Sequence, residues 1–504
     1  MTTASDHDAS RVDGRGWTPR LIFSLVSIVL VLEVLSVGYM TVSMALPAIT
    51  TEFRTDQGAW LITAFLLVGA VTAPLVGKLA DMYGKRRLLI WCIAISTAGT
   101  LMSAIATSYA VMIAGRALGG MLVPCLFLSY SLIRDVFPPK IVPLAVSIST
   151  AGMGLITVAA PFLAGWLIDG FGWRSVFWFF GGILVVLVFL VLASTPETSV
   201  RLRSRVDFIG AALLGAGLAG VLIAVSFGPT WGWTAPITLV FLLGGVVLVV
   251  GWYLSAQRVP EPLIGLDVLG RRPVLYTVIA AGAVYGVGAL YSIVLPMMTM
   301  TPDTFGLGYG FGLDAEGFAL FQVPLGVMTM AGGIVVGTLC GRGVPPRTLL
   351  AASMVFLGSG AALTAVQHDA KPTLFVFAAI VGLGMGLGYA AVPNQLIAAV
   401  PPELQASTAG IAGVVQSLVS AALPVIAFAV MNNSFVAPLS PADTGGAVVY
   451  TNGGFVAAFV IAVFTAVVGV LAVSAIPRRV EQFSVHDPAA PGVGAVVGTH
   501  VDAP

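Results

Sequence analysis

The sequence predicts an all-α integral membrane protein with fourteen membrane-spanning helices. Three observations support this: 58% of the 504 residues are hydrophobic, only 9% are charged, and the mean hydropathy is +1.01. A soluble domain carries about 25% charged residues because its surface faces water. The apolar runs are about 20 residues long, as membrane helices are, whereas strands of a membrane barrel are about ten residues long and alternate. Helices are therefore favoured over a closed barrel.

Fourteen apolar runs of suitable length follow one another along the chain. They lie at 21–48, 60–79, 88–107, 110–133, 142–168, 173–195, 207–227, 235–255, 274–298, 317–339, 348–367, 372–399, 404–432 and 453–476. An even number of spans places both termini on one side of the membrane. Residues 477–504 are rich in Pro, Ala and Gly without an apolar period, which predicts a disordered tail.

Lysine and arginine are distributed unevenly between the two sides of these spans. With the amino terminus inside, external segments contain only Arg54, Arg174 and Lys371, and Arg116 lies within a span. All other members of the 23 Lys and Arg residues fall in internal segments. Because basic loops remain in the cytoplasm, we expect a multi-pass protein of a bacterial inner membrane with both termini cytoplasmic.

Composition argues against several other classes of protein. A net charge of +1 leaves no basic face for nucleic acid. The three cysteines lie in apolar runs without metal-ligand spacing. An intramembrane enzyme would need a Ser/His pair, two aspartates or a metal cluster, and the predicted spans contain neither His nor an Asp pair. We therefore expect no enzymatic activity and no metal or organic cofactor.

The most specific motif lies between the second and third predicted spans. It reads GKLADMYGKRR from Gly77 to Arg87. Its glycines allow helix backbones to approach closely, and Asp81 can cap a helix amino terminus or pair with an arginine. A loop that only fixed the topology would need the basic residues but not this spacing of Gly and Asp.

This motif resembles the signature between helices two and three of the major facilitator superfamily. Fourteen spans narrow the resemblance to the drug:proton antiporter branch typified by EmrB and QacA. Further similar segments across nearly the whole chain are ALP at 45–47, WLIT at 60–63, Arg116 followed by Gly119 and Gly120, and WRSVF at 173–177. The resemblance implies a major-facilitator fold, with two six-helix halves, two extra central helices and a substrate site near the midplane between the halves.

A degraded second copy of the motif, with Gly337, Gly341 and Arg342, lies where an internal repeat would place it. The implied division of the chain is a cytoplasmic segment (1–20), an N-terminal half (21–195), two extra helices with linkers (196–273), a C-terminal half (274–476) and the tail (477–504).

The resemblance also implies which residues govern conformational change. These are Gly77, Asp81, Gly84, Lys85, Arg86, Arg134, Pro161 and Gly165. The chain departs from the antiporter pattern at two places. The segment APFLAG at 160–165 stands where the antiporters have GPxxGG, and Gly38 stands where an acidic residue usually precedes the ALP proline by nine positions.

Glu33 is the only one of the 22 acidic residues deep inside an apolar run. Burying a carboxylate there costs a few kcal/mol at least, so a functional role is the default expectation. The alternative is a neutral or hydrogen-bonded carboxyl that holds a neighbouring helix. Glu33 does not directly replace the missing acid, because Gly38 lies five residues on, about 140° around the helix.

Arg116 is the only basic residue predicted inside the membrane. Its depth from the inner face, about 18 Å, agrees with the depth of about 20 Å calculated for Glu33. Isolated opposite charges in lipid are expected to pair, since pairing offsets part of the desolvation of both. We therefore predict that Glu33 and Arg116 form a pair in which Glu33 takes up and releases a coupling proton.

Other polar side chains within the spans are candidates for lining a substrate cavity, although each could instead join helices by hydrogen bonds. They are Ser36, Tyr39, Met40, Ser43, Tyr291, Gln322, Asn394, Gln395 and Gln416.

Together these features predict a proton-coupled exporter of lipophilic or amphipathic small molecules, a multidrug efflux antiporter that works by alternating access. A proton gradient would supply the energy, and a monomer in the lipid bilayer would suffice for function. The alternative is a carrier of the same superfamily for a specific metabolite, lipid or natural product, with or without proton coupling.

Overall fold

The computed structural model describes residues 17–55, 57–202, 204–302, 307–313, 315–432, 434 and 450–478, except the side chains at 39, 47, 59, 153–159, 161, 315, 316 and 319. Almost all of the predicted disordered tail and most of the amino-terminal segment therefore lie outside the described residues. Within the described residues there are helices and no β-strand.

The first group of helices corresponds to the first six predicted spans. It comprises α1 (Pro19–Phe53), α2 (Ala59–Tyr83), α3 (Lys85–Ala104), α4 (Tyr109–Gly119), η1 (Gly120–Leu122), α5 (Pro124–Val136), α6 (Val142–Phe171) and α7 (Arg174–Ser194). The fourth predicted span is not one continuous α-helix. It consists of α4, the 3-10 turn η1 and α5, which together are long enough to cross the membrane. Gly119, Gly120 and Pro124 lie at this interruption, where glycine weakens the α-helix and proline is accepted only in a first helical turn.

The remaining helices follow in the predicted order. They are α8 (Phe208–Trp231), α9 (Pro236–Ala256), α10 (Leu266–Leu269), α11 (Arg272–Met300), α12 (Ala315–Gly341), α13 (Pro346–Val366), α14 (Lys371–Ala399), η3 (Pro402–Leu404), α15 (Gln405–Met431) and α17 (Asn452–Ser474). Thirteen spans in the described residues are long and apolar enough to cross a membrane. The continuous 30-residue α6 completes the fourteen, so the predicted fold class is confirmed.

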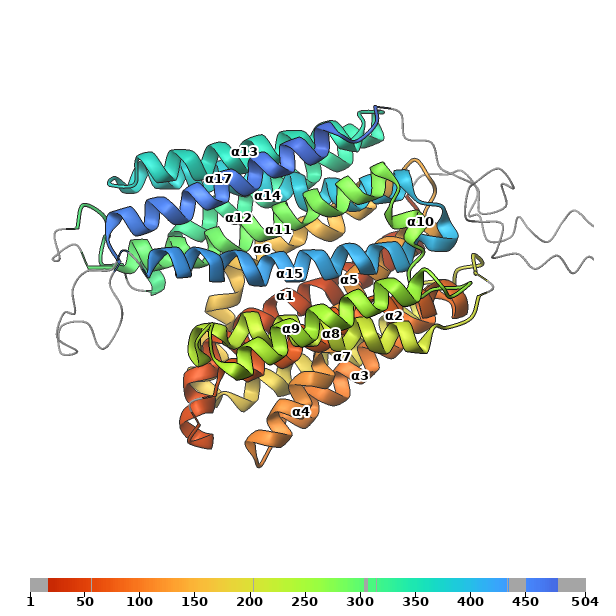
Figure 1. Ribbon diagram of the computed structural model, residues 1–504, viewed down its shortest axis with the longest axis horizontal. Helices are drawn as coiled ribbons and strands as arrows, with labels where there is room; N and C mark the ends of the chain where they lie inside the picture. Colours follow the sequence, from red (N-terminus) through yellow and green to blue (C-terminus); the bar gives the residue numbers. More distant parts are fainter. Residues whose placement is uncertain are drawn as a thin grey trace, which may run out of the picture.

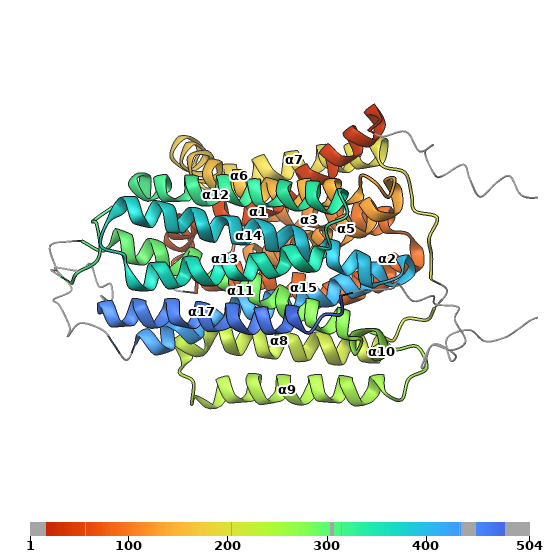
Figure 2. The same ribbon diagram turned by 90° about the horizontal axis from the view of Figure 1, so that it is seen from above.

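The helices form two bodies, each with its own apolar core. One core is built mainly from α1 to α7, with Ala406 and Ala409 at the start of α15, and the other from α11 to α17. In Figure 1, α11 to α14 and α17 lie above α1 to α5 and α7, and α6 and α15 run along the boundary between the two bodies. The start of α1 and the end of α17 lie at the same end of the bundle, at the right of Figure 1 and Figure 2. We call this the termini end and the opposite one the far end.

Glycines allow the two bodies to pack closely at two places. A Cβ atom on Gly77 in α2 would lie 2.5 Å from the carbonyl oxygen of Ala406 in α15. A Cβ atom on Gly333 in α12 would lie 2.7 Å from the Cβ of Ala151 in α6. The second helix of each body thus contacts the fifth of the other, as expected for two similar halves related by a pseudo-twofold axis along the membrane normal.

Helices α8 and α9 form a hairpin beside the two bodies, and Figure 2 shows α9 at the outer edge of the bundle. Gly217 and Gly245 permit close contact between α8 and α9. Val240 and Val247 of α9 are exposed, 69% and 67%, which fits helix faces that contact lipid rather than water.

Candidate functional site

Asp81 joins the two bodies at the termini end. Its carboxylate accepts hydrogen bonds from the backbone N–H of Ala406, 3.1 Å, and of Ser407, 2.8 Å, at the start of α15. The Asp81 side chain is fully buried. The first N–H groups of a helix lack intrahelical partners and carry the positive end of the helix dipole, so a carboxylate stabilises them. The predicted capping role of Asp81 has a defined partner here.

Two basic residues, Lys85 of the motif and Arg134 of α5, make contacts across the same boundary. Lys85 is fully buried and donates to Asp135, 2.7 Å, and to the carbonyl of Pro402, 3.0 Å. Arg134 donates to the carbonyl of Val400, 2.7 Å, and to the side chain of Gln405, 2.6 Å. We call the contacts of Asp81, Lys85 and Arg134 with residues 400–407 the inter-half lock.

The linker that follows α7 supports this lock from the other side. Glu197 accepts hydrogen bonds from the backbone N–H of Arg86 and Arg87, both 3.1 Å, and so caps α3. Gly84 adopts φ +113°, and a Cβ atom there would lie 2.9 Å from the Glu197 carboxyl group, so glycine is required at this turn. Thr198 donates to Asp135, 2.7 Å. Reasoning from sequence missed Asp135, Glu197 and Thr198; the adjacency of Asp135 to Arg134 was the available signal.

Three other residues that were expected to govern conformational change are less closely involved in contacts between the two bodies: Arg86, Gly165 and Pro161. The guanidinium group of Arg86 donates to the carbonyl of Leu192 in α7, within the first body. A Cβ atom on Gly165 would meet only a carboxylate oxygen of Asp169, at 3.9 Å, so this glycine is not needed for packing here. The side chain of Pro161 lies outside the described residues.

Glu33 lies in the middle of α1 and is 8% exposed. Neither carboxylate oxygen has a hydrogen-bond partner among the described residues. The side chain points at Gly152 of α6, where an added Cβ atom would lie 1.7 Å from Oε1. The carboxyl group therefore occupies space that only a glycine at position 152 leaves open.

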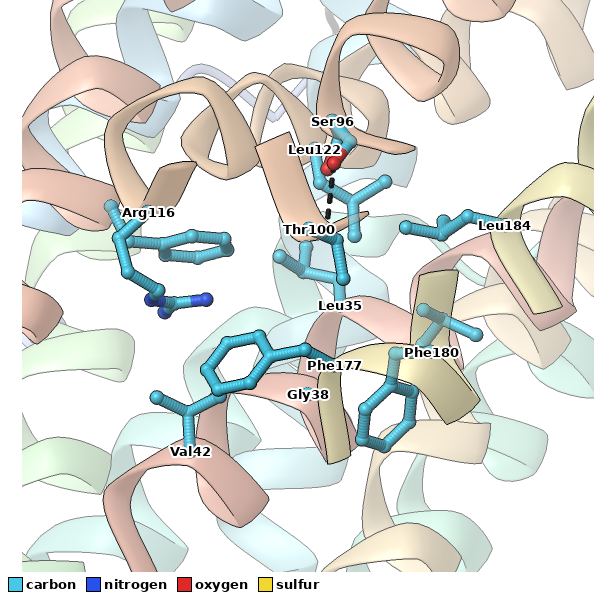
Figure 3. A pocket seen from close by; sticks show the side chains of 12 residues that line it. Leu35, Gly38, Val42, Ser96, Thr100, Arg116, Leu122, Phe177, Phe180 and Leu184 are labelled. Carbon is cyan, nitrogen blue, oxygen red and sulfur yellow. Dashed lines mark hydrogen bonds between the residues drawn. The ribbon is translucent and has the colours of Figure 1, made fainter. Parts of the chain in front are cut away.

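Arg116 lies in α4 and shares a small cavity with a different face of α1. Its Nε donates to the carbonyl of Leu61, 3.1 Å, and its guanidinium group stacks on the ring of Phe65, 4.4 Å from the centroid. Figure 3 shows it beside a small cavity of about 30 Å³ that Gly38 and Val42 also line. This volume is comparable to that of one water molecule.

The predicted contact between Glu33 and Arg116 is not formed. No ion pair joins these two described residues, and the carboxyl group of Glu33 faces α6 instead. On α1, Gly38 and Val42, which border Arg116, lie about 140° and about 180° around the helix from Glu33. The two charges were predicted to lie at the same depth, but Glu33 and Arg116 lie on opposite sides of α1.

The structure does not gather the predicted substrate-cavity residues into one site. Tyr291 is fully buried in the second body, where its hydroxyl contacts that of Thr364 at 3.2 Å. Asn394 joins the bodies by donating to Ser147 of α6, 3.2 Å. Gln395 and Gln416 are buried, and Ser36, Met40, Ser43 and Gln322 are partly exposed. The side chain of Tyr39 lies outside the described residues.

A larger cavity of about 1610 Å³ lies at the termini end. Both bodies line it, with Arg134 and Asp135 from the end of α5 and Asn394 and Cys340 from the second body. It is large enough for a drug-sized molecule. One side of the cavity is thus formed by residues of the inter-half lock.

At the far end, Glu52 ties α1 to α7. It accepts hydrogen bonds from Arg174, 2.9 Å, and from the indole N–H of Trp173, 2.6 Å. These hydrogen bonds, with that of Arg174 the largest cause, lower the pKa of Glu52 below its usual value. This contact stays within the first body.

Comparisons with known proteins agree with this architecture. The family model of the Major Facilitator Superfamily matches residues 28–208 and 206–424. The structure resembles the crystal structure of the human organic anion transporter MFSD10 (TETRAN), with a TM-score of 0.61 and 14% identity over 92% of this chain and 100% of that chain. That similarity concerns the fold alone.

Curated bacterial relatives are modestly similar in sequence. The MFS-type transporter YvkA of Bacillus subtilis is 24% identical over 77% of this chain and 85% of its own length. The tetracenomycin C resistance and export protein of Streptomyces glaucescens is 26% identical over 81% and 74%. A multidrug resistance protein B homolog of Mycobacterium tuberculosis is 29% identical over 68% and 64%. The MFS-type transporter Rv1877 of Mycobacterium tuberculosis is matched over 51% of its length. The chain belongs to the Major Facilitator Superfamily, whose members are membrane carriers rather than enzymes.

Proposed function

We propose that this carrier exports lipophilic or amphipathic small molecules from the cytoplasm in exchange for protons. Two relatives named for multidrug resistance and tetracenomycin C export support an export role. The basic residues of the termini end support a cytoplasmic position for that end, in a bacterial inner membrane. The protein would act as a monomer and use the proton gradient as its energy source.

Alternating access would depend on the inter-half lock. Asp81, Lys85 and Arg134 bind the start of α15 and the residues before it. Opening the termini end to the cytoplasm must break these contacts, because they join α2, α3 and α5 to the opposite body. The cavity of about 1610 Å³ at this end would then admit a substrate from the cytoplasm.

The observation that carries the proton-coupled mechanism is the isolated carboxyl group of Glu33. An ionised carboxylate at this depth without a donor would be destabilised by several kcal/mol, so the protonated form fits this conformation. Glu33 faces α6, and the neighbouring Ala151 contacts Gly333 of the opposite body. A movement of α6 against α12 would change the surroundings of the carboxyl group and allow it to release its proton.

Transport by purified protein in liposomes tests this proposal. With an imposed pH gradient, wild-type protein should accumulate compounds from a panel of lipophilic cations and neutral aromatic dyes. Glu33→Gln should abolish gradient-driven accumulation while retaining substrate binding. Glu52→Gln, which removes an acid from the exposed end of the same helix, is the matched control and should remain driven by the gradient. Full gradient-driven transport by Glu33→Gln would refute the role of Glu33.

The direction of transport can be tested in cells. A strain that lacks the protein should accumulate more of a lipophilic dye than the complemented strain. Lower accumulation in the deletion strain would identify an importer and contradict the export proposal.

A second candidate is export of one natural product without proton coupling, favoured by the relative named for tetracenomycin C. In that case a single compound class should saturate transport, and collapse of the pH gradient should leave its initial rate unchanged.

A further inference from the structure

A buried histidine, His368, lies at the far end in the short connection between α13 and α14. Its neighbours in the chain, Gln367 and Asp369, are exposed, whereas His368 is only 5% exposed. It is the only histidine among the described residues, and the transport steps proposed above do not use it. A ring that is buried between two exposed neighbours is held by specific contacts.

Both ring nitrogens of His368 face oxygen atoms. Nδ1 lies 2.9 Å from the carbonyl oxygen of Thr364 in the last turn of α13. Nε2 lies 2.6 Å from Oδ1 of Asn452, the first residue of α17. A carbonyl oxygen only accepts, so Nδ1 carries a hydrogen, and Nε2 can donate to Oδ1 only if it carries one as well. This geometry corresponds to the doubly protonated imidazolium, which is positively charged.

The end of α13 is a favourable place for that positive charge. The last carbonyl groups of a helix lack intrahelical partners and carry the negative end of the helix dipole. The carbonyl group of Thr364 belongs to this last turn and accepts directly from the ring. A protonated His368 therefore caps α13 while its other nitrogen reaches α17.

Few other ionisable groups face the ring among the described residues. Asp369 and Lys371 lie in the same connection and at the start of α14; both are exposed and their charges are opposite. Helix α17 contains no ionisable side chain. Two tyrosines lie nearby: Tyr291 of α11 contacts the hydroxyl of Thr364, and Tyr450 donates to Asn432. The protonation state of this contact is therefore set mainly by His368 itself.

The same two helices are joined at the termini end by a residue whose charge is permanent. Figure 1 shows α13 and α17 side by side at the edge of the second body. Arg347, at the start of α13, donates to the carbonyl oxygens of Val473, 3.1 Å, and Ser474, 3.0 Å, at the end of α17. A guanidinium group stays charged, whereas histidines change charge between about pH 5 and 8. The two ends of this helix pair are therefore expected to respond differently to pH.

We propose that His368 is a pH-dependent joint, which ties the end of α13 to the start of α17 when its imidazole is protonated. When the proton leaves Nε2, a lone pair of this nitrogen faces Oδ1 of Asn452, and the contact opens. The topology proposed above places the far end outside the cell, so the joint would respond to the external pH. The inference otherwise depends neither on the substrate nor on Glu33.

Hydrogen exchange of the backbone amides of α17 tests this joint in the purified full-length protein. His368→Leu removes both donors. At about pH 5.5, amides in the first two turns of α17 should exchange about ten- to a hundredfold more slowly in wild type than in His368→Leu, as expected for one hydrogen bond to a charged group. At about pH 8.5 this ratio should fall to about one, because the imidazole is then neutral.

The other end of α17 is the internal control. Arg347 keeps its charge and its contacts in both proteins, so amides near Ser474 should exchange at the same rate in wild type and His368→Leu. This should hold at both pH values. Comparing the two proteins at the same pH also removes the pH dependence of the chemical exchange step.

Asn452→Asp distinguishes a charged ring from a neutral one. A carboxylate only accepts, so it strengthens a contact with an imidazolium and is repelled by a nitrogen lone pair. An aspartate at a helix start is stabilising in itself, so the reference is the double variant Asn452→Asp with His368→Leu. At about pH 7, Asn452→Asp should slow exchange, relative to this reference, more than wild type does relative to His368→Leu.

Two results would overturn the inference: a ratio between wild type and His368→Leu that is the same at acid and alkaline pH, or faster exchange in Asn452→Asp than in the double variant. Both results concern the joint alone. A protein that shows the joint but does not transport in exchange for protons would contradict the export proposal and not the role of His368.

Discussion

Asp81→Asn is expected to open the termini end by weakening the inter-half lock. Both oxygens of the Asp81 carboxylate accept hydrogen bonds from the start of α15, at 3.1 and 2.8 Å. An asparagine has one oxygen acceptor and no charge, so it satisfies one of these N–H groups and places its own N–H₂ group against the other. Opening the termini end would break this contact, so we expect only the conformation closed at that end to lose stability.

The size of the shift follows from the bonds that are lost. A hydrogen bond to a charged group contributes about 1.5–3 kcal/mol, so a loss of about 2–3 kcal/mol is expected. That free energy changes the ratio of the two conformations about 30- to 150-fold. If the conformation open at the termini end is about 1% populated in the wild type, its population should rise to about 25–60% in Asp81→Asn.

Distances between spin labels measure this shift. Arg87 and Arg342 are exposed at the termini end, one in each body, and Thr107 and Lys371 are exposed at the far end. In Asp81→Asn the first pair should gain a longer-distance population and the second pair a shorter one.

Asp207→Asn is the control for this experiment. Asp207 is a buried aspartate that caps α8 by accepting from Gly210, 2.7 Å, and does not contact residues 400–407. It should leave both distance distributions as in the wild type. Wild-type distributions in Asp81→Asn, with correct insertion, would refute the view that this carboxylate holds the two bodies together.

Three further predictions follow from local geometry. Gly152→Ala would drive a methyl group into the Glu33 carboxyl group, so gradient-driven transport should fall at least tenfold while expression is retained. Gly38→Asp should fold, because nothing lies within 4 Å of a Cβ atom there, and it should place a carboxylate beside Arg116 that changes the pH dependence of the transport rate. Glu52→Gln should flatten the decrease in unfolding temperature at acid pH. The lowered pKa of Glu52 makes its contribution present at neutral pH, above the unfolded value, and lost as the pH falls through the lowered value.

For each of these three variants, one result would contradict the prediction. Gly165→Ala is the control for Gly152→Ala, because a Cβ atom there meets only Asp169 at 3.9 Å; equal transport by both variants would contradict the account of Glu33. If the transport rate of Gly38→Asp depended on pH as that of the wild type does, the new carboxyl group would have no effect on transport. If the unfolding temperature of Glu52→Gln fell at acid pH as steeply as that of the wild type, Glu52 would not contribute to the stability of the far end.

The fold was predictable because its main determinant is local. A run of about 20 apolar residues forms a helix in lipid wherever it occurs, since its backbone groups must be satisfied within the segment. The turn η1 was not predicted, although Gly119, Gly120 and Pro124 mark its position. Hydropathy records how apolar a span is, not whether its backbone remains α-helical throughout.

The candidate site was only partly predictable because its contacts join distant segments. Asp81 was expected to cap a helix, but its partners lie more than three hundred residues later in the chain. The pairing of Glu33 with Arg116 failed for a related reason. Sequence position gives the depth of a side chain along a helix, whereas the direction in which α1 presents Glu33 depends on how α1 packs against α6 and α7.

Proton movement during transport tests the central claim most directly. Liposomes that contain the purified carrier and an entrapped pH-sensitive dye are given a gradient of a transported substrate without an imposed pH gradient. The account predicts that substrate movement drives protons in the opposite direction in wild-type protein, and that Glu33→Gln moves no protons. Substrate transport by wild-type protein without any change in internal pH, or unchanged proton movement by Glu33→Gln, would contradict it.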